Sequence, residues 1–339
     1  MPSDPLFIVG TERSGSNLLR LILDSHSSIV IPHPPHVVRY FAPLVSRYGN
    51  LAETPRFRAL VDDVLQLVHA HIHPWPWVPG ADEVIERCAS RDLLTIYAAL
   101  HDAVKERSGK NRWGCKSTFM IHVAEEVLRR WPNGRLLWLY RDPRDVAASS
   151  RDSVFSTFHP IHTARLWTEQ QDLGLQIEAK QPGNVLRVRY ESLVADPEAE
   201  VTRICTFLGE KFQPGMLQWF AGAEAKRSAA LAESWSNTAA PMREDRRERW
   251  RRDLTPMDAR SVEVIAGATM AALGYARADE TSEGVAAARN AGCSIWLADR
   301  WMRARVELRS IRRDKNAWKR WRRGAVMARI RWRLRLRGR

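Results

Sequence analysis

The chain has 339 residues, of which 45% are hydrophobic and 14 are tryptophan. This length allows one large domain or two medium ones, and the apolar content excludes a chain that is disordered throughout. The net charge of +14 is concentrated in residues 296–339, which hold 17 of the 53 basic residues and 3 of the 39 acidic ones. Residues 1–295 are therefore formally neutral, so the overall charge says little about an active site among them.

The cysteines and the N-terminus bear on the cellular compartment. The four cysteines, Cys88, Cys115, Cys205 and Cys293, form no CxxC pair, and their spacing argues against a zinc site and against a disulfide framework. We therefore expect reduced, mostly buried thiols in a cytoplasmic protein. The first ten residues lack the pattern of a secretory signal. The apolar stretch 264–276 is shorter than the roughly 20 residues of a membrane span and predicts a core helix.

Short apolar runs alternate with helical patterns along the chain. Residues 6–9 (LFIV) form a continuous apolar run that ends at Gly10, as is typical of a buried parallel strand. Residues 17–25 follow with apolar positions at helical spacing. The same reasoning predicts strands over 112–116, 136–140 and 185–189, and helices over 119–131, 143–150, 162–180, 197–210, 214–222 and 256–273. This succession predicts an α/β fold with a doubly wound, mostly parallel sheet flanked by helices, and ligands at the carboxyl ends of its strands.

Changes in composition divide the chain into three parts. Residues 1–276 carry the α/β pattern and predict a catalytic domain. Residues 277–294 are mostly small and polar and predict a linker. Residues 295–339 form a basic tail, rich in Trp and Arg, that is expected to be helical and separate from the catalytic domain.

A glycine loop connects the first strand to the first helix. Gly10 and Gly15 have the spacing of the GxxxxGK[ST] loop, but Ser16 replaces its lysine and Asn17 its magnesium-binding hydroxyl. Glycines let the backbone approach an anion, and the N–H groups at the start of a helix point toward it. With Arg13 as its positive charge, the loop predicts a phosphate-like ligand other than Mg·ATP. The alternative is a purely structural turn from strand to helix.

A second candidate anion site follows the strand 136–140. Arg141 comes directly after this strand, where an ATPase commonly places a magnesium-binding Asp. Ser149 follows about two helical turns later and faces the same groove. The pair predicts an anionic ligand. The alternative is a surface network in which Asp142, Arg144 and Asp145 cap the helix.

Together these segments resemble the sulfotransferases that use 3′-phosphoadenosine 5′-phosphosulfate (PAPS). Residues 13–19 (RSGSNLL) are similar to the 5′-phosphosulfate loop of that family, usually written RSGTTLL, with Asn17 where Thr is common. Arg141 and Ser149 are similar to its 3′-phosphate pair. Three further segments match in order, namely 113–116 (WGCK), 189–193 (RYESL) and 249–252 (RWRR). The resemblance covers roughly residues 5–275.

The resemblance implies a P-loop-like sulfotransferase fold and sulfuryl transfer from PAPS as co-substrate, without a metal. It also implies that Lys116 is the catalytic lysine, that Arg13 takes part in catalysis, and that residues 249–252 close over the nucleotide. The implied PAPS-binding residues are Arg13, Ser14, Gly15, Ser16, Asn17, Leu18, Arg141, Ser149, Arg249, Arg251 and Arg252.

The acceptor needs a general base near neutral pH, a role that suits His or Glu. Many family members have Glu in an IPPE-like stretch about 20 residues after the loop. Here residues 31–36 read IPHPPH, and proline falls on that position. His36 is the first candidate for the base and His33 the second, each with an ordinary packing role as the alternative. An unperturbed histidine titrates near about pH 6.5.

Two aromatic patterns follow these histidines. His69, His71 and His73 spell HxHxH, but residues 57–67 predict a helix and no nearby Cys or carboxylate completes a ligand set. We therefore expect no metal site there. Residues 74–77 (PWPW) either line an acceptor pocket or pack as an ordinary loop.

The basic tail bears on the partners. Residues 296–339 mix Trp with Lys and Arg, as in 318–323 (WKRWRR), which favours an anionic membrane surface over nucleic acid. A solvated basic extension is the alternative. We expect a small-molecule, glycan or lipid acceptor and peripheral association with the inner face of the membrane. The acceptor's identity and the oligomeric state stay open. The competing functions are a P-loop nucleotide phosphotransferase and an interaction protein that acts through the tail.

Overall fold

The computed structural model describes residues 4–151, 153, 159–231, 238–242, 247–278, 292–313 and 316–337. Five strands of this part form one sheet in the order β2-β3-β1-β4-β5, and every neighbouring pair is parallel. The strands are β1 (Leu6–Gly10), β2 (Ile29–Val30), β3 (Arg112–Lys116), β4 (Arg135–Tyr140) and β5 (Val185–Arg189). The predicted doubly wound α/β fold is confirmed.

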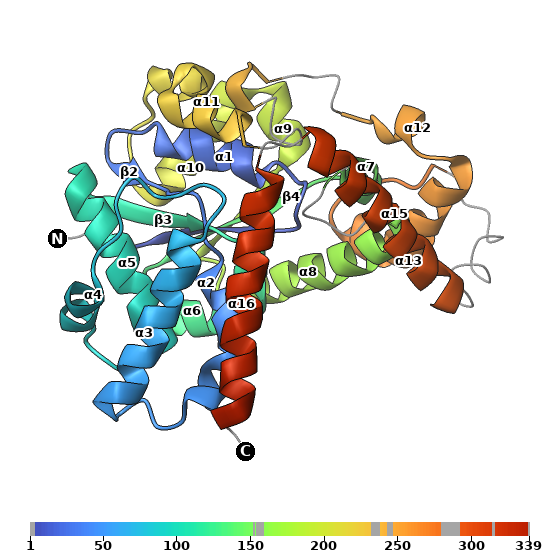
Figure 1. The fold of residues 1–339 in the computed structure, drawn as a ribbon. Coiled ribbons are helices and arrows are strands. Elements are labelled where there is room, and N and C mark those ends of the chain that lie inside the picture. The colour runs from blue at the N-terminus through green and yellow to red at the C-terminus, as the bar shows by residue number, and fades with distance from the viewer. Residues whose placement is uncertain are drawn as a thin grey trace.

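The sheet is covered on both faces because its strands bury side chains alternately to either side. In β1, Phe7 and Val9 join one apolar core, whereas Leu6 and Ile8 join the other. Figure 1 shows the corresponding layers above and below the sheet. The upper layer contains α1 (Ser16–Asp24), α9 (Tyr190–Ala195), α10 (Pro197–Leu208), η3 (Pro214–Ala221) and α11 (Ala223–Ala229). The lower layer contains α2 (Val37–Phe41), η1 (Ala42–Tyr48), α3 (Thr54–His69), α4 (Ala81–Arg87), α5 (Leu93–Ser108), α6 (Ala124–Arg130) and α8 (Pro160–Lys180).

The order of the strands locates the ligand site. The chain moves from β1 outward to β2 and β3, and then crosses to β4 on the other side of β1. In open α/β sheets, ligands bind at the carboxyl ends of the strands where the order reverses. Two of the segments singled out above follow β1 and β4, and β3 ends at Lys116. The topology therefore brings the candidate residues to one edge of the sheet.

Two predicted helices differ from the structure in type. Residues 119–131 begin as a 3₁₀ helix, η2 (Thr118–Val123), which continues as α6, and η3 is also 3₁₀. The helix predicted over 57–67 is α3, whereas the two-residue strand β2 and the other helices between β2 and β3 were not predicted. The remaining helices of the body are α7 (Pro143–Ser150), α12 (Trp250–Asp253) and α13 (Pro256–Ala272).

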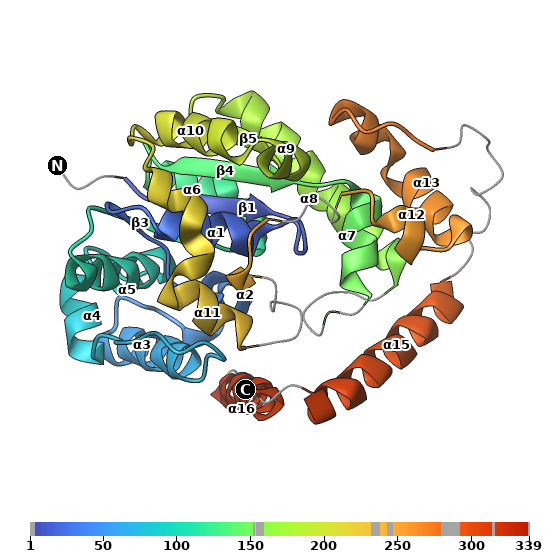
Figure 2. The ribbon, with the colours of Figure 1, turned by 90° about the horizontal axis from the view of Figure 1, so that it is seen from above.

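The C-terminal segment forms two long helices, α15 (Gly292–Arg313) and α16 (Ala317–Arg337). The sequence predicted a tail separate from the catalytic domain, but α16 packs against α3 and η1. Met327, Ile330 and Leu334 are buried in the lower core, and Arg333 pairs with the buried Asp63 of α3. Figure 2 shows α15 and α16 on the same side of the molecule. Most of the predicted linker, and the side chain of Cys293, lie outside the described residues.

The exposed face of α16 is aromatic. Trp318, Trp321, Trp332 and Leu336 are all more than half exposed, and their spacing places them along one stripe of the helix. The buried positions 327, 330 and 334 lie on the opposite side. Among the helices that the structure describes, none combines the length and the apolar character that crossing a bilayer demands.

Candidate active site

The loop between β1 and α1 can form only with glycine at two positions. Gly10 has a φ of 133°, and a Cβ there would lie 2.0 Å from the carbonyl oxygen of Leu139. Gly15 has a φ of 95°, and its Cβ would lie 2.5 Å from the ring of Tyr190. These conformations and contacts exclude other residues. The loop is therefore held tightly between the ends of β4 and β5.

The end of this loop offers polar groups that the protein leaves unused. No side chain caps the start of α1, so its first N–H groups are available to a ligand. The Ser14 hydroxyl and the Asn17 side-chain nitrogen are buried without a partner among the described residues. Asn17 is fixed in place because its Oδ1 accepts a hydrogen bond of 2.8 Å from Arg20 Nε. Since an unsatisfied buried polar group is costly, this arrangement fits an anionic ligand.

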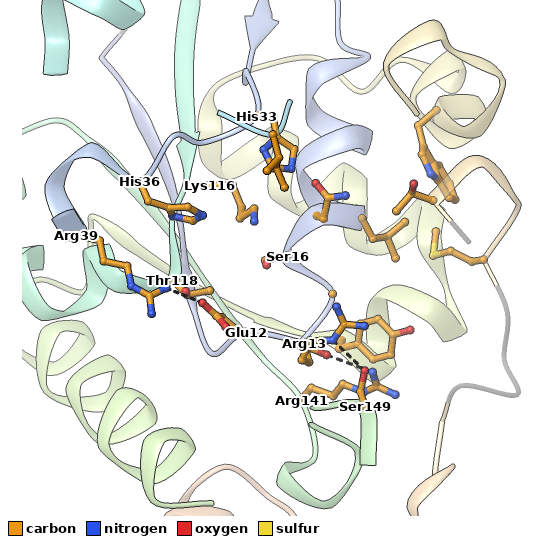
Figure 3. A pocket seen from close by; sticks show the side chains of 18 of the residues that line it. Glu12, Arg13, Ser16, His33, His36, Arg39, Lys116, Thr118, Arg141 and Ser149 are labelled. Carbon is orange, nitrogen blue, oxygen red and sulfur yellow. Dashed lines mark hydrogen bonds and ion pairs between the residues drawn. The ribbon is translucent and has the colours of Figure 1, made fainter. Parts of the chain in front are cut away.

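The two predicted anion motifs meet in space. Arg13 Nε donates a hydrogen bond of 3.1 Å to Ser149 Oγ, and Arg141 Nη1 donates one of 3.3 Å to the carbonyl oxygen of Arg13. Arg141 is buried, pairs with Asp145 at 3.3 Å and lies over the ring of Tyr190 at 4.3 Å. Figure 3 shows Arg13, Arg141 and Ser149 together at one end of the pocket.

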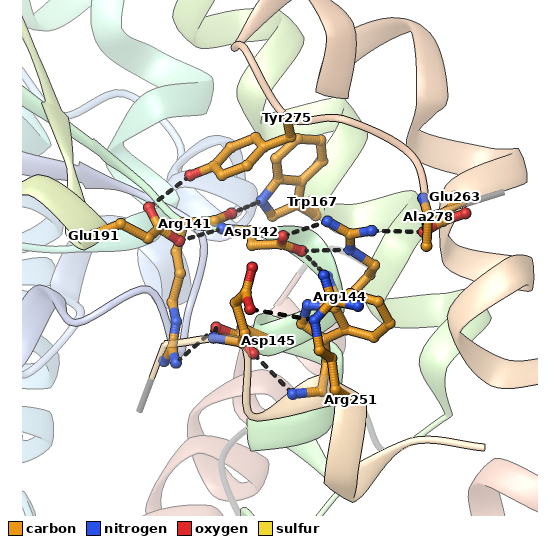
Figure 4. A network of polar contacts seen from close by, with 12 residues as sticks. Arg141, Asp142, Arg144, Asp145, Trp167, Glu191, Arg251, Glu263, Tyr275 and Ala278 are labelled. Carbon is orange, nitrogen blue, oxygen red and sulfur yellow. Dashed lines mark hydrogen bonds and ion pairs between the residues drawn. The ribbon is translucent and has the colours of Figure 1, made fainter. Parts of the chain in front are cut away.

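The helix-capping network predicted as an alternative also exists, beside the pocket. Asp142 caps α7 by accepting a hydrogen bond from the Arg144 N–H, and the Arg144 side chain binds Asp142 and Glu263. Asp145 accepts hydrogen bonds of 3.0 Å from the backbone N–H groups of Glu248 and Trp250. Figure 4 shows this network around Arg144 and Asp145. It fixes α7 and the segment before α12, and so supports Arg141 and Ser149 indirectly.

Lys116 ends β3 and is buried in the pocket wall. Burial lowers the pKa of its ammonium group to about 8, and the positive charges of Arg20 and Arg13 act in the same direction. Glu12 opposes this shift. Lys116 is therefore mostly protonated at pH 7 but loses its charge within a moderately alkaline range.

Both candidate bases line the pocket, in different environments. His33 is fully enclosed, and its ring stacks on His73 at 4.9 Å between centroids. His36 lies in the left-handed region (φ 59°) at the start of α2, and its Nδ1 is buried without a hydrogen-bond partner among the described residues. Burial, the main cause, lowers the pKa of both rings well below 6.5, and the charge of Lys116 adds to this. Both imidazoles are thus neutral at pH 7, which corrects the expected titration near 6.5.

The HxHxH and PWPW segments pack largely against one another and against His33, and only His71 of their aromatic side chains lines the pocket. Among the described residues, no group of three or more His, Cys, Asp or Glu side chains is arranged to hold a metal ion. His71 and His73 instead surround the ring of His33. Trp75 is buried and donates a 2.7 Å hydrogen bond to the carbonyl oxygen of His33. Trp77 lies under Arg107, and neither tryptophan lines the pocket.

The predicted basic segment contributes only in part. Arg249 lines the pocket and is paired with Asp253 at 2.6 Å. Arg251 and Arg252 do not line it. Arg251 pairs instead with Glu248 at 3.2 Å, and Arg252 pairs with Asp253 at 2.8 Å. Of the loop residues, Arg13, Gly15, Ser16, Asn17 and Leu18 line the pocket, and Ser14 is buried behind it.

The pocket is a cavity of about 420 Å³ that contains residues which sequence reasoning missed. Arg39 and Tyr40 lie three and four residues after His36, and this closeness to a candidate base was a weak signal in the sequence. Arg303 of α15 and Arg323 of α16 had none, because they lie far along the chain. Glu12 is the only carboxylate among the described lining residues, and it pairs with Arg39 at 2.9 Å.

Comparison with known proteins gives a consistent result. A family model described as the sulfotransferase family matches residues 5–214. Protein-tyrosine sulfotransferase A of Caenorhabditis elegans is 26% identical over 210 residues, covering 60% of this chain and 49% of that protein. This chain thus spans about half the length of that relative. Carbohydrate sulfotransferase 1 of Danio rerio is 24% identical over 301 residues, covering 68% and 71%.

A solved structure has the same fold. The sulfotransferase domain from the olefin synthase of Synechococcus PCC 7002 superposes with a TM-score of 0.52 at 20% identity. The match covers 79% of this chain and 94% of that domain.

Proposed function

Since this chain belongs to the sulfotransferase family, we propose that it transfers a sulfuryl group from PAPS to a hydroxyl or amine of a carbohydrate, lipid or small-metabolite acceptor. The main support is the 3.1 Å contact between Arg13 Nε and Ser149 Oγ. This contact joins two anion motifs in the cavity that also contains Lys116.

The donor fits one end of this cavity. In this proposal the N–H groups of α1 and Arg13 bind the 5′-phosphosulfate, while Arg141 and Ser149 bind the 3′-phosphate. The buried, unpartnered Ser14 hydroxyl and Asn17 amide gain partners when an anion is bound. Gly15 is needed to keep Arg141 in position, because a side chain at residue 15 would displace the Tyr190 ring against which Arg141 packs.

The chemistry is a displacement at sulfur. The bond between sulfur and the 5′-phosphate oxygen breaks as a bond to the acceptor oxygen forms, and the acceptor's proton passes to the neutral imidazole of His36. Lys116 and Arg13 neutralise the negative charge that develops on the phosphate. The protein holds both partners in position, which is the largest part of catalysis in such transfers. Figure 3 shows His36 next to Lys116, with Ser16 between them and the Arg141 end.

Ligand-dependent melting tests the donor assignment. We expect 3′,5′-adenosine bisphosphate (PAP) to raise the melting temperature of the full chain, because a ligand that binds only the folded state stabilises it. Mg·ATP should have little effect, since Ser16 and Asn17 replace the residues that bind its γ-phosphate and magnesium. Stabilisation by Mg·ATP but not by PAP would favour a nucleotide phosphotransferase instead.

We also propose that the exposed face of α16 contacts an anionic membrane surface. Three exposed tryptophans share a stripe with Leu336, and Arg322 and Arg329 lie on the same exposed side. Aromatic rings beside basic residues suit the lipid headgroup region. The full chain should therefore cosediment with vesicles of phosphatidylserine and phosphatidylcholine at physiological salt. Replacing Trp318, Trp321 and Trp332 with Ser should abolish this, and an unmodified chain that stays in the supernatant would refute the proposal.

A further inference from the structure

Arg323 of α16 lies in the pocket wall and has no counter-ion among the residues that the structure describes. Its Nη2 donates a hydrogen bond of 3.3 Å to the carbonyl oxygen of Pro35, and its guanidinium lies 4.7 Å from the ring centroid of Tyr40. Its Nε is buried and has no hydrogen-bond partner in the described part of the chain. Among the described residues, no carboxylate forms an ion pair with it. A half-buried charge of this kind is costly unless an anion completes the site.

The position of Arg323 places it at the acceptor end. Pro35 directly precedes His36, and Arg323 lowers the pKa of both His36 and His71 by its charge. Arg13, Arg141 and Ser149 lie at the opposite end of the cavity (Figure 3). The donor's phosphates therefore have their own set of partners, and Arg323 remains available for the second substrate.

The other charges at this end do not neutralise Arg323. Glu12 is engaged by Arg39 at 2.9 Å, and His33, His36 and His71 are neutral at pH 7 because burial lowers their pKa values. Lys116, which lies between the two ends, and Arg303 of α15 add further positive charge to the lining of the cavity. The acceptor end is thus cationic, and α16 forms part of it.

We infer that Arg323 binds a negatively charged group of the acceptor, such as a carboxylate or phosphate, so that the enzyme sulfates hydroxyl compounds that already carry an anion. The reaction named in this inference rests on the proposed function, whereas the anion site itself does not depend on it. A charge-assisted, two-pronged contact from Arg is the interaction that best discriminates an anionic acceptor from its neutral analogue.

Matched probes test the anion site directly. 4-Hydroxybenzoate and 4-hydroxybenzamide differ in charge but share the phenol, and glycerol 3-phosphate and glycerol form a second pair. Binding of each probe to the full chain is measured by calorimetry, with and without PAP. We expect at least one anionic member to bind about tenfold more tightly than its neutral partner.

Variants assign the preference to Arg323. Arg323→Gln should abolish the difference between paired probes, and Arg323→Lys should retain part of it because the charge is kept. Arg322→Gln is the matched control, because Arg322 is the exposed neighbour on the same helix and does not line the pocket. It should leave the preference unchanged.

The outcomes separate this inference from the proposed function. Equal binding of charged and neutral probes by the unmodified chain, including no binding of either, overturns the inference, as does a preference that survives in Arg323→Gln. Failure of PAP to bind overturns the donor assignment, while the probe comparison in PAP-free protein still decides the role of Arg323.

Discussion

The two ends of the pocket are built in different ways. At the donor end, Arg13, Arg141 and Ser149 hold one another through hydrogen bonds, and Arg144 and Asp145 fix their supports. At the acceptor end, His36 Nδ1 and Arg323 Nε are buried without partners among the described residues. Both ends leave polar groups for a ligand to complete, because Ser14 Oγ and Asn17 Nδ2 also lack partners among the described residues. Only at the donor end, however, do the two arginines already hold each other in position. In the proposed reaction, the more organised end binds the donor and the other end binds the acceptor.

The largest expected effect lies at the acceptor end. His36→Ala should lower kcat by about 10²–10⁴-fold, as expected for the loss of a general base, while the affinity for PAP stays nearly unchanged. Because burial lowers the pKa of His36, the acidic limb of kcat/KM should lie below pH 6.5 and disappear in the variant. Steady-state kinetics from pH 4.5 to 8 check both points.

His33→Ala is the control for that prediction. Its ring is enclosed by His71 and His73, so its loss should affect melting temperature more than turnover. If the large loss of turnover follows His33→Ala and not His36→Ala, the role of base moves to His33.

Lys116 lies between the two ends and should give the next largest effect. Lys116→Ala should lower turnover at saturating donor by about 10²–10³-fold, as for other groups that stabilise developing negative charge. Because the pKa of Lys116 is about 8, the ammonium is charged below this value and neutral above it. The kcat/KM for the donor should therefore fall as the pH rises through about 8. Turnover that is unchanged in the variant would remove Lys116 from the catalytic groups.

The smallest effects are expected at the donor end, where each contact is one of several. Arg141→Ala should weaken PAP binding by about 10- to 100-fold, because it removes a charge-assisted contact. Ser149→Ala should weaken it by about 10-fold, since one hydrogen bond from an uncharged hydroxyl to the phosphate is lost. Calorimetric titration with PAP measures both.

Ser150→Ala is the matched control for the donor end. Its hydroxyl bonds to the carbonyl oxygen of Val146 within α7 and does not line the pocket. PAP affinity equal to that of the unmodified chain is expected for Ser150→Ala. The same result for Arg141→Ala would contradict the assignment of the 3′-phosphate site.

Sequence reasoning predicted the donor end better than the acceptor end, for a physical reason. The donor residues follow buried strands directly, and parallel strands bring their carboxyl ends together. Hence the order of elements placed Arg13 and Arg141 at one edge of the sheet, and the family resemblance joined them in one site. Of the predicted arginines 249, 251 and 252, only Arg249 lines the pocket, because a run of arginines does not reveal which of them turns inward; the roles of Arg251 and Arg252 stay predictions.

The acceptor end depends on packing between distant helices. Nothing local to residue 323 distinguishes it from residue 322, because the difference arises only when Met327, Ile330 and Leu334 dock on the body and set the rotation of α16. The low pKa values of the histidines likewise come from burial by several elements. Such properties belong to the assembled core and are absent from any short stretch of sequence.

The packing of α16 on α3 has a consequence for how the protein is made. The ribosome releases Asp63 and the apolar face of α3 early, yet Arg333 and the buried residues of α16 emerge some 270 positions later. Domains fold as units during synthesis once their residues are available. The nascent chain therefore carries an incomplete lower core and an incomplete pocket wall until α16 has been synthesised, so a truncation before α16 removes part of the body and not only an appendage.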